Sequence, residues 1–265
     1  MTEKGDIIIG RALPDWVRLT TFEFSAVERL ITERPDVKRV TKRQNYRGQL
    51  YDGVWVGRGN QLGKAHWMAE CTGDDAARNW RKLPEGMKCT RIDIQVTLKV
   101  PWHAIAEMAQ ELRAVPWKGR QRQLRLISND NREDTLYIGA RQSHKYIRIY
   151  AKGTPSNQIV RFEIEYKGAM AVAVWETLHD GTLPGEIVAA EIWDIPHVES
   201  SKPFETWAAS WDTAERYSFP VPATKRAWVE STCFPALWKA ARSHSDTEWL
   251  YNELVSVVHF LENKG

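Results

Sequence analysis

The stretch that most constrains the fold is a strand–turn–strand pattern over residues 135–153, which read TLYIGARQSHKYIRIYAKG. In its second strand, Ile147 and Ile149 fall on one face, because side chains alternate between the two faces of a β-strand. The residues interleaved with them fall on the opposite face: Tyr146, Arg148, Tyr150 and Lys152. The pattern therefore predicts a strand with one apolar face and one basic, phenolic face.

Two further segments show the same alternation. Residues 91–98 read RIDIQVTL and residues 160–167 read VRFEIEYK, so each has aliphatic or aromatic residues at every second position. Asp93, Glu163 and Glu165 lie among the polar residues of these segments. If the three segments pair in one sheet, one face is apolar and the other gathers carboxylates, guanidiniums and phenols. Such a face is suited to handling a phosphodiester.

An internal repeat predicts the rest of the architecture. Val54–Arg58 (VWVGR), with a second strand near His66–Glu70, resembles Leu136–Arg141 with Tyr146–Tyr150. A strand and a helix precede each hairpin, and a helix follows it. We therefore expect an α+β protein whose central antiparallel sheet is built from two strand–helix–hairpin–helix repeats, with a C-terminal helical tail. A chance likeness of two β-hairpins is the alternative.

Periodicity, caps and turn residues give the expected bounds of the elements. In the first repeat these are a strand at 16–24, a helix at 25–34, hairpin strands at 51–56 and 64–70 around a turn at 57–63, and a helix at 74–80. In the second they are a strand at 91–100, a helix at 101–114 with Pro101 in its first position, a strand at 159–166 and a helix at 169–178.

Three regions follow from this pattern. Residues 1–88 form an N-terminal repeat that serves as a scaffold or positions DNA, because residues 66–70 (HWMAE) lack the charged array of the second copy. Residues 89–180 form the repeat that carries the site. Residues 181–265 form an irregular linker with short helices and a helical tail, whose apolar stripe at 224–261 packs on the core.

The net charge of +3 does not by itself indicate nucleic-acid binding, so the prediction of DNA contacts depends on local clusters of basic residues. Residues 38–47 carry five basic residues, either as a solvated loop or as a loop on DNA phosphates, and residues 117–125 place four beside Trp117. The candidate DNA-binding residues are Lys38, Arg39, Lys42, Arg43, Arg47, Lys118, Arg120, Arg122 and Arg141.

Several classes of protein are disfavoured by what the sequence lacks. It has no Walker loop, no G-x-S-x-G elbow and no H-x-H pair. Its three cysteines have no metal-ligand spacing, which is typical of a reducing cytoplasm. No export signal and no apolar run of 18 residues is found, so we expect a cytoplasmic protein without a membrane span.

The charged face offers the parts of a nuclease. The phenol of Tyr150 needs nearby positive charge to act as a nucleophile, and Arg148 and Lys152 lie two residues away on its own face. Tyr137 and Tyr146 are rival nucleophiles, with Tyr137 better suited to packing.

The acids of this face have two interpretations. Asp93, Glu163 and Glu165 are hard oxygen ligands suited to Mg²⁺ or Mn²⁺. Alternatively, Glu163 and Glu165 form cross-strand ion pairs with Arg148 and Arg161. Spacing alone does not decide between these two interpretations.

Four motifs, in this order, carry a family resemblance: Thr90–Asp93 (TRID), Tyr137–Ser143 (YIGARQS), Tyr146–Lys152 (YIRIYAK) and Val160–Glu165 (VRFEIE). Together they resemble the replication initiation factor family, which includes rolling-circle plasmid initiators, filamentous-phage replication proteins and relaxases of some integrative conjugative elements. The resemblance spans roughly residues 14–178, and the tail resembles the helical end of the phage members.

The resemblance implies that a tyrosine nicks a double-strand origin, leaving a 5′-phosphotyrosyl bond and a 3′-hydroxyl primer. Carried over by position, Tyr150 is the nucleophile, and Asp93, Glu163 and Glu165 hold Mg²⁺ or Mn²⁺. Arg148 and Lys152 assist at the phosphate. The partners that it implies are origin DNA, extruded or single-stranded at the nick site, and a host helicase in a bacterial cytoplasm; a homodimer stays open.

Three departures from the family pattern favour a second hypothesis. Ala140 stands where serine is common, Ala151 where an acid is common, and Thr97 where a second aspartate often follows. A homologue without that carboxylate could bind an origin as an accessory or regulatory protein and leave it uncut. A third hypothesis, a protein-interaction module whose polar face is only ion-paired, is disfavoured by the basic stretches.

Overall fold

The computed structural model describes residues 9–32, 37–43, 45–84, 86–117, 122–128 and 134–211, without the side chains of 37–42. All of them belong to the first of two compact units, Met1–Ser218. The second unit, Phe219–Gly265, lies outside the described residues, and so does the tail predicted to be helical over 224–261.

Within the described residues, ten strands form one antiparallel sheet in the order β2-β3-β4-β5-β1-β6-β10-β9-β8-β7. The strands are β1 (Leu13–Thr21), β2 (Val37–Arg43), β3 (Tyr46–Tyr51), β4 (Val54–Gln61), β5 (Lys64–Thr72), β6 (Lys88–Leu98), β7 (Leu124–Ile127), β8 (Thr135–Ile138), β9 (Lys145–Thr154) and β10 (Asn157–Lys167). The predicted α+β class with a central antiparallel sheet is confirmed.

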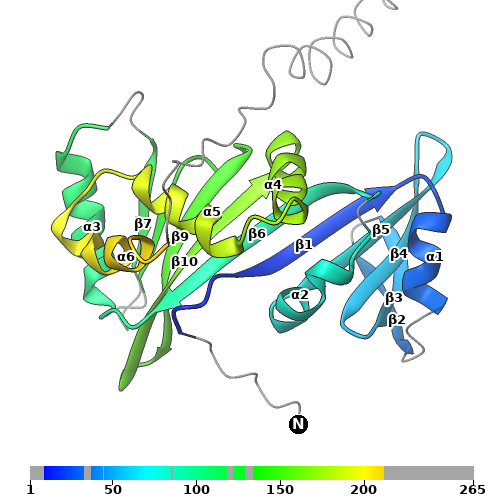
Figure 1. Cartoon of the computed structure of the whole chain (residues 1–265), viewed down its shortest axis with the longest axis horizontal. Coiled ribbons are helices and arrows are strands. Elements are labelled where there is room, and N and C mark those ends of the chain that lie inside the picture. Colours follow the sequence, from blue (N-terminus) through cyan, green and yellow to red (C-terminus); the bar gives the residue numbers. More distant parts are fainter. Residues whose placement is uncertain are drawn as a thin grey trace, which may run out of the picture. The chain divides into compact units, whose positions relative to one another are not determined.

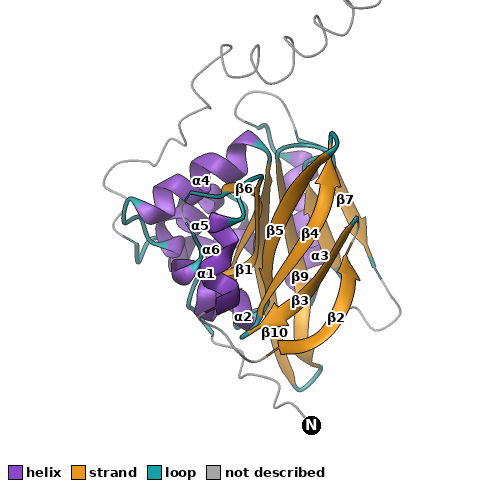
Figure 2. Cartoon of the chain, turned by 90° about the vertical axis from the view of Figure 1, so that its right-hand side faces the viewer, coloured by secondary structure: helices purple, strands orange, loops and turns teal. Residues whose placement is uncertain are grey.

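Helices lie against this sheet (Figures 1 and 2). They are α1 (Ser25–Thr32), α2 (Asp74–Asn79), α3 (His103–Ala114), α4 (Ala169–His179), α5 (Pro184–Trp193) and α6 (Lys202–Ala208), with 3₁₀ turns η1 (Trp80–Lys82) and η2 (Glu199–Ser201). Figure 2 shows α1, α2, α4, α5 and α6 on one side of the strands.

The elements follow one order in each half of the chain. The first half runs β1–α1–β2–β3–β4–β5–α2 and the second runs β6–α3–β7–β8–β9–β10–α4, with β1 and β6 side by side in the middle of the sheet. This order is compatible with the predicted repeat, which stays a prediction. Each half has strands that the sequence pattern did not predict, namely β2 and β3 in the first and β7 in the second.

The apolar core lies between the sheet and the helices. Ile92 and Ile94 of β6 and Phe162 of β10 are fully buried on the face that α4, α5 and α6 cover. The ring of Phe162 lies 5.7 Å from that of Phe204 in α6. The predicted stripe of α3 is buried as expected: Ile105, Met108, Ala109 and Leu112.

The segment predicted to be a linker contains α5, η2 and α6, and these pack on the core. Ile187 and Val188 of α5 are fully buried. The buried Glu191 joins α5 to the sheet, because its carboxylate accepts bonds from Lys145 Nζ at 2.7 Å and from Tyr166 Oη at 3.0 Å. In this way α5 is fixed to both β9 and β10.

Two predictions of local structure were wrong. The turn expected over 57–63 is much shorter, because β4 continues to Gln61. Gly57 and Gly59 lie within this strand and make room for aromatic rings. The ring of Trp55 fills the space that a side chain at position 57 would need, and the ring of Tyr46 fills the space at position 59. The loop expected over 38–47 is instead β2 and β3.

The start of α3 also differs from expectation. Pro101 lies before the helix, which begins at His103 after Trp102. The backbone N–H of Trp102 donates to Gln158 Oε1 at 3.0 Å, so the chain is held to the β9–β10 hairpin before the helix starts.

Two glycines allow the sheet to turn into the helix that follows each half. Gly73 (φ 59°, ψ −135°) precedes α2 and Gly168 (φ 56°, ψ −131°) precedes α4, in a region that side chains strongly disfavour. We expect Gly73→Ala and Gly168→Ala each to lower the free energy of unfolding by about 1–3 kcal/mol. Denaturant titration measures this effect.

The matched control is Gly86→Ala, because Gly86 is exposed, has no positive φ and has open space at its Cβ position. Its effect should stay within about 0.5 kcal/mol. Equal stability of Gly73→Ala and the control would show that backbone strain at this turn is unimportant, since an added Cβ at Gly73 also meets no atom within 4 Å.

Candidate active site

Three adjacent strands carry the candidate site on the face of the sheet opposite α4, α5 and α6. β10 lies between β6 and β9, with Glu165 opposite Asp93 on one side and Glu163 opposite Arg148 on the other. Arg161 lies opposite Tyr150 in the same way. Because the three segments alternate with the same parity, pairing them brings the charged side chains of 91–98, 146–152 and 160–167 to one face.

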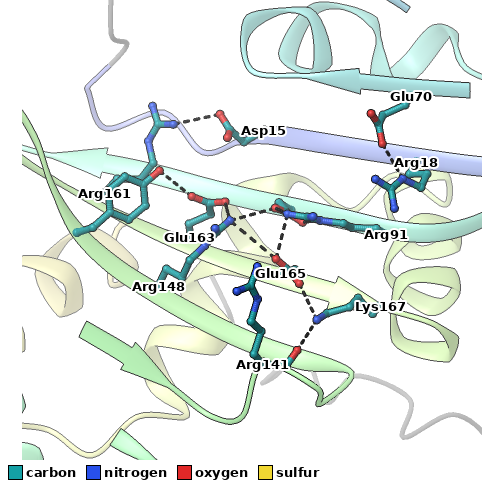
Figure 3. A network of polar contacts seen from close by, with 12 residues as sticks. Asp15, Arg18, Glu70, Arg91, Arg141, Arg148, Arg161, Glu163, Glu165 and Lys167 are labelled. Carbon is teal, nitrogen blue, oxygen red and sulfur yellow. Dashed lines mark hydrogen bonds and ion pairs between the residues drawn. The ribbon is translucent and has the colours of Figure 1, made fainter. Parts of the chain in front are cut away.

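One guanidinium nitrogen lies where three carboxylates converge (Figure 3). Arg148 Nη2 donates to Glu163 Oε1 and lies 3.3 Å from Asp93 Oδ2 and 4.0 Å from Glu165 Oε2. The three acids are buried, with 1%, 3% and 8% of Asp93, Glu163 and Glu165 exposed. Arg148 therefore neutralises charges that would be highly unfavourable alone in this environment.

Arg91 is the second cation of the cluster. Its Nε and Nη2 contact Asp93 Oδ1 and Oδ2 at 2.8 and 2.6 Å, a bidentate pair, and its Nη2 lies 3.0 Å from Glu165 Oε2. The guanidinium lies 4.2 Å from the ring centre of Trp16 in β1. Lys167 Nζ contacts the other oxygen of Glu165 at 2.7 Å.

Tyr150 is bound to the same acid as Arg148. Its hydroxyl donates to Glu163 Oε2 at 2.7 Å. Burial, and then the negative charge of Glu163, raise the pKa of the Tyr150 phenol well above its usual value. The phenol is therefore neutral in the resting protein, and Glu163 is placed to accept its proton.

Lys152 shares the face of Tyr150 but forms no close contact with the acid cluster. Burial and then the charge of Arg161 lower the pKa of Lys152. Its ammonium group therefore gives up a proton more readily than an exposed lysine would.

Arg161 binds other partners than those expected. Its Nη1 lies 3.1 Å from Asp15 Oδ1 in β1, and its Nε donates to Thr97 Oγ1 at 3.1 Å. The predicted ion pair of Arg161 with a glutamate is therefore wrong, whereas that of Arg148 with Glu163 is present. Thr97, where the family often has an acid, is fully buried and donates in turn to Gln95 Oε1 at 3.0 Å.

Asp15, Trp16 and Arg91 are the contacts that sequence reasoning missed. Asp15 and Trp16 belong to β1, and only the antiparallel pairing of β1 with β6, in which Trp16 lies opposite Asp93, brings them to the site. Arg91 was visible in the alternation of its own strand, because it shares the face of Asp93. That shared parity was the available signal.

The pKa values of Asp93 and Glu165 are shifted in opposite directions. Burial raises the pKa of Asp93 to about 7; Arg91 lowers it, and the charges of Glu163 and Glu165 raise it. Burial alone would also raise the pKa of Glu165, but its bond to Lys167, with the charges of Arg91 and Arg148, lowers it.

Among the described residues, no group of three or more His, Cys, Asp or Glu side chains is arranged to hold a metal ion. Asp93, Glu163 and Glu165 nevertheless have an oxygen within 4.0 Å of a common cation, the Arg148 nitrogen. This set of hard oxygen donors fits Mg²⁺ or Mn²⁺ in chemical type. In the described structure, the guanidinium of Arg148 occupies the position among these carboxylates that the ion would need.

The candidate DNA-binding residues are spread over both halves of the described chain, with Lys42 of β2 opposite Arg47 of β3. Arg43 binds Glu70 Oε1 at 2.5 Å and lies 5.2 Å from the ring centre of Trp55. Arg122 binds Asp194 and lies over Trp117, and the carbonyl of Arg141 accepts a bond from Lys167. Arg47 lies on β3 and is exposed. The side chains of Lys38, Arg39, Lys42, Lys118 and Arg120 lie outside the described part of the chain.

The rival tyrosines stack on each other. The rings of Tyr137 and Tyr146 lie 5.5 Å apart at an interplanar angle of 15°. Tyr146 is 8% exposed, and burial raises the pKa of its phenol. Neither hydroxyl has the carboxylate partner that Tyr150 has among the described residues.

The replication initiation factor family model matches residues 87–233, which is more than half of the chain. The chain therefore belongs to this family. The match includes β6, β9 and β10, and so the three acids, Arg148, Tyr150 and Lys152. β1, with Asp15 and Trp16, precedes it.

A solved structure shows a related fold. A rolling circle replication initiator protein from Geobacillus stearothermophilus has a TM-score of 0.55 at 19% identity, covering 76% of this chain and 94% of that one. CalU16 from Micromonospora echinospora (TM-score 0.22, 12% identity, 51% and 93% covered) and DynU16 of the dynemicin biosynthetic locus (0.21, 10%, 62% and 92%) are much less similar.

No curated protein matches the sequence. Within the described part of the chain, no helix combines the length and apolar composition that crossing a bilayer requires.

The raised pKa of Asp93 predicts a pH effect on stability. A carboxyl whose pKa rises from 3.8 to about 7 on folding stabilises the protein at low pH, and this contribution is lost as the pH rises towards 7. Relative to wild type, Asp93→Asn should therefore gain stability between pH 5 and 7.5, by at most about 1.4 kcal/mol per pH unit. Urea unfolding of both proteins across this range measures it.

The opposite trend would be a fall in the free energy of unfolding of Asp93→Asn relative to wild type as the pH rises. It would mean that the bidentate bond from Arg91 outweighs burial at Asp93. Thr177→Ser, a conservative change at a buried residue of α4 without an ionisable group, is the control. Its stability difference from wild type should not vary with pH.

Proposed function

We propose that this protein nicks and rejoins DNA at a rolling-circle replication origin, with Tyr150 as the nucleophile. The observation that carries the proposal is the 2.7 Å bond from the Tyr150 hydroxyl to Glu163, beside the guanidinium of Arg148. Membership of the replication initiation factor family supports it. The phenol, its proton acceptor and the positive charge needed at a phosphate all lie on one face of the sheet.

The chemical step follows from these neighbours. Tyr150 Oη forms a bond to phosphorus while the bond from phosphorus to the 3′-oxygen breaks, and the phenol proton passes to Glu163. The 3′-oxygen takes a proton from Lys152, whose lowered pKa favours this transfer. The products are a 5′-phosphotyrosine and a 3′-hydroxyl. The reverse step rejoins the strand, and no ATP is needed because the phosphodiester energy is kept in the new bond.

Asp93, Glu163 and Glu165 would hold a divalent ion, Mg²⁺ or Mn²⁺. When bound, such an ion supplies positive charge to the phosphate oxygens and favours the ionised phenol. Arg148 must then leave its present place, and its buried Nε has no hydrogen-bond partner in the described structure that would hold it there. We propose that the displaced guanidinium contacts the phosphate instead.

A second candidate is an origin-binding accessory protein that does not cut. The observation that favours it is that all three carboxylates are already paired with arginines or a lysine. Thr97 adds to this, because it puts a neutral hydroxyl where a further acid is common in the family. In that case the cluster serves only to stabilise the sheet.

Removing one hydroxyl separates the two candidates. Tyr150→Phe should bind origin DNA with unchanged affinity but form no covalent protein–DNA adduct on supercoiled or single-stranded origin DNA with Mn²⁺. Denaturing gel electrophoresis of labelled DNA measures the adduct. Tyr137→Phe and Tyr146→Phe are matched controls that should keep it.

An adduct that survives in Tyr150→Phe and disappears in one of the controls would transfer the role of nucleophile to that tyrosine. If wild type binds the DNA but gives neither adduct nor relaxed plasmid, the accessory function is correct.

Metal binding can be tested without DNA. Mn²⁺ at about one hundred times its Kd should stabilise wild type by about 2.7 kcal/mol, read as a rise in Tm. Asp93→Asn/Glu163→Gln should lose this rise. Arg148→Gln should be less stable than wild type without metal, because the acids lose a counter-charge, and should gain more from Mn²⁺.

Glu107→Gln, on the exposed side of α3, is the control and should respond to Mn²⁺ as wild type does. An equal rise in Tm in the Asp93→Asn/Glu163→Gln protein would place the ion elsewhere. A weaker gain in Arg148→Gln would show that the arginine does not compete with it.

A further inference from the structure

A second cationic feature lies in the first half of the chain, outside the family match. Lys42, Arg47, Arg58 and Trp67 are cross-strand neighbours in register on β2, β3, β4 and β5. Three basic residues and a tryptophan thus form one row across four strands. The row as a whole contains no acidic residue.

A cavity of about 210 Å³ lies at this row, between α1 and strands β3 to β5. Its lining includes Ile31 of α1 and both Arg47 and Arg58, with Trp67. Gly48 also lines it, in β3, where a side chain would meet the backbone of Val56. The cavity therefore joins two guanidiniums and the indole of Trp67.

Arg47 and Arg58 of this row have no acidic partner within the described part of the chain. Arg47 and Arg58 lie directly opposite each other, both exposed, and neither forms an ion pair with a carboxylate of the described residues. Like charges that face each other across two strands are destabilising. An anion between them would turn this repulsion into attraction, and a phosphate matches the donor geometry of two guanidiniums.

The aromatic side of the row is accessible. Arg58 lies 5.8 Å from the ring centre of Trp67, and the ring of Phe24 lies 5.0 Å from that of Trp67. Phe24 is 46% exposed, which is high for a large apolar side chain. A planar base can stack on such a pair of rings, and stacking tolerates any base sequence.

We infer that this cavity binds a nucleotide unit of single-stranded DNA, with the phosphate between Arg47 and Arg58 and the base against Trp67 and Phe24. The inference rests on the proposed function in that DNA is the ligand. Trp67 and Glu70 lie on opposite faces of β5. Glu70 is on the face of the acid cluster, because it binds Arg18, which lies over the ring of Trp16. The bound segment is therefore a different one from the segment presented to Tyr150.

The experiment measures binding of a fluorescent oligothymidylate to the full-length protein by anisotropy, over a series of KCl concentrations. Arg47→Gln/Arg58→Gln should bind about tenfold more weakly and lower the slope of log K against log[salt] by about 0.7, the contribution of the one phosphate that the two arginines neutralise together. Trp67→Leu should also weaken binding but keep the slope, because it removes stacking and no charge.

Arg78→Gln/Arg113→Gln is the matched control. It removes the same charge from exposed positions of α2 and α3. Its affinity should fall by less than twofold. If both double variants weaken binding equally, only net charge matters, and the cavity is not a nucleotide site.

Stability gives a second measurement. Because Arg47 and Arg58 repel each other in the free protein, Arg47→Gln/Arg58→Gln should have a Tm no lower than that of wild type. A lower Tm together with wild-type DNA affinity would make the two arginines structural and overturn the inference. Failure of wild type to form a Tyr150 adduct would refute the nicking function alone, since the oligonucleotide binding assay does not depend on it.

Discussion

The whole structure depends on how buried carboxylates are neutralised in the middle of an extended sheet. Asp93 and Glu163 are almost inaccessible to water, and a charge in that position is strongly unfavourable unless a cation lies against it. Arg91 meets this need from the strand of Asp93 itself and Arg148 from the strand beside Glu163, and Trp16 covers the guanidinium of Arg91. The cluster ties β1, β6, β9 and β10 together on the face opposite α4, α5 and α6. The apolar packing on the opposite face can then be continuous.

This compensation also explains how one set of side chains can serve stability and chemistry. Arginine side chains supply diffuse positive charge at the point where the acids converge, so the sheet can fold without any other cation. The side chain of Arg148 is long, and its Nε has no hydrogen-bond partner among the described residues. It can therefore move without breaking a contact to the backbone. If the proposed ion takes the place of Arg148, the acids have a cation beside them both before and after the ion binds.

The sequence predicted the local part of this arrangement and missed the non-local part. Strict alternation in β6, β9 and β10 was enough to assign their faces, because a strand has a period of two. The partner of Arg161 could not be found in this way, because Asp15 is 146 positions away and reaches it only through the register of β1. The glycines of β4 were misleading for a related reason: they accommodate the rings of Trp55 and Tyr46, and only the folded sheet shows this. The row of Lys42, Arg47, Arg58 and Trp67 was found only in part for the same reason: Lys42 and Arg47 were named as candidates, but Arg58 and Trp67 join them only through the pairing of four strands.

The two halves of the sheet differ in how their charged side chains are paired among the described residues, and this difference bears on function. In the second half every carboxylate of the site has a cation beside it, an arrangement that is compatible with the proposed exchange of a protein cation for a metal ion. In the first half Arg47 and Arg58 face each other with no acidic partner among the described residues, which is unfavourable in the free protein. A ligand that brings negative charge would relieve this repulsion. The proposed binding of a nucleotide at this pair therefore gives the first half a role beyond that of a scaffold, and it does so through a charge pair of the opposite kind to those of the acid cluster.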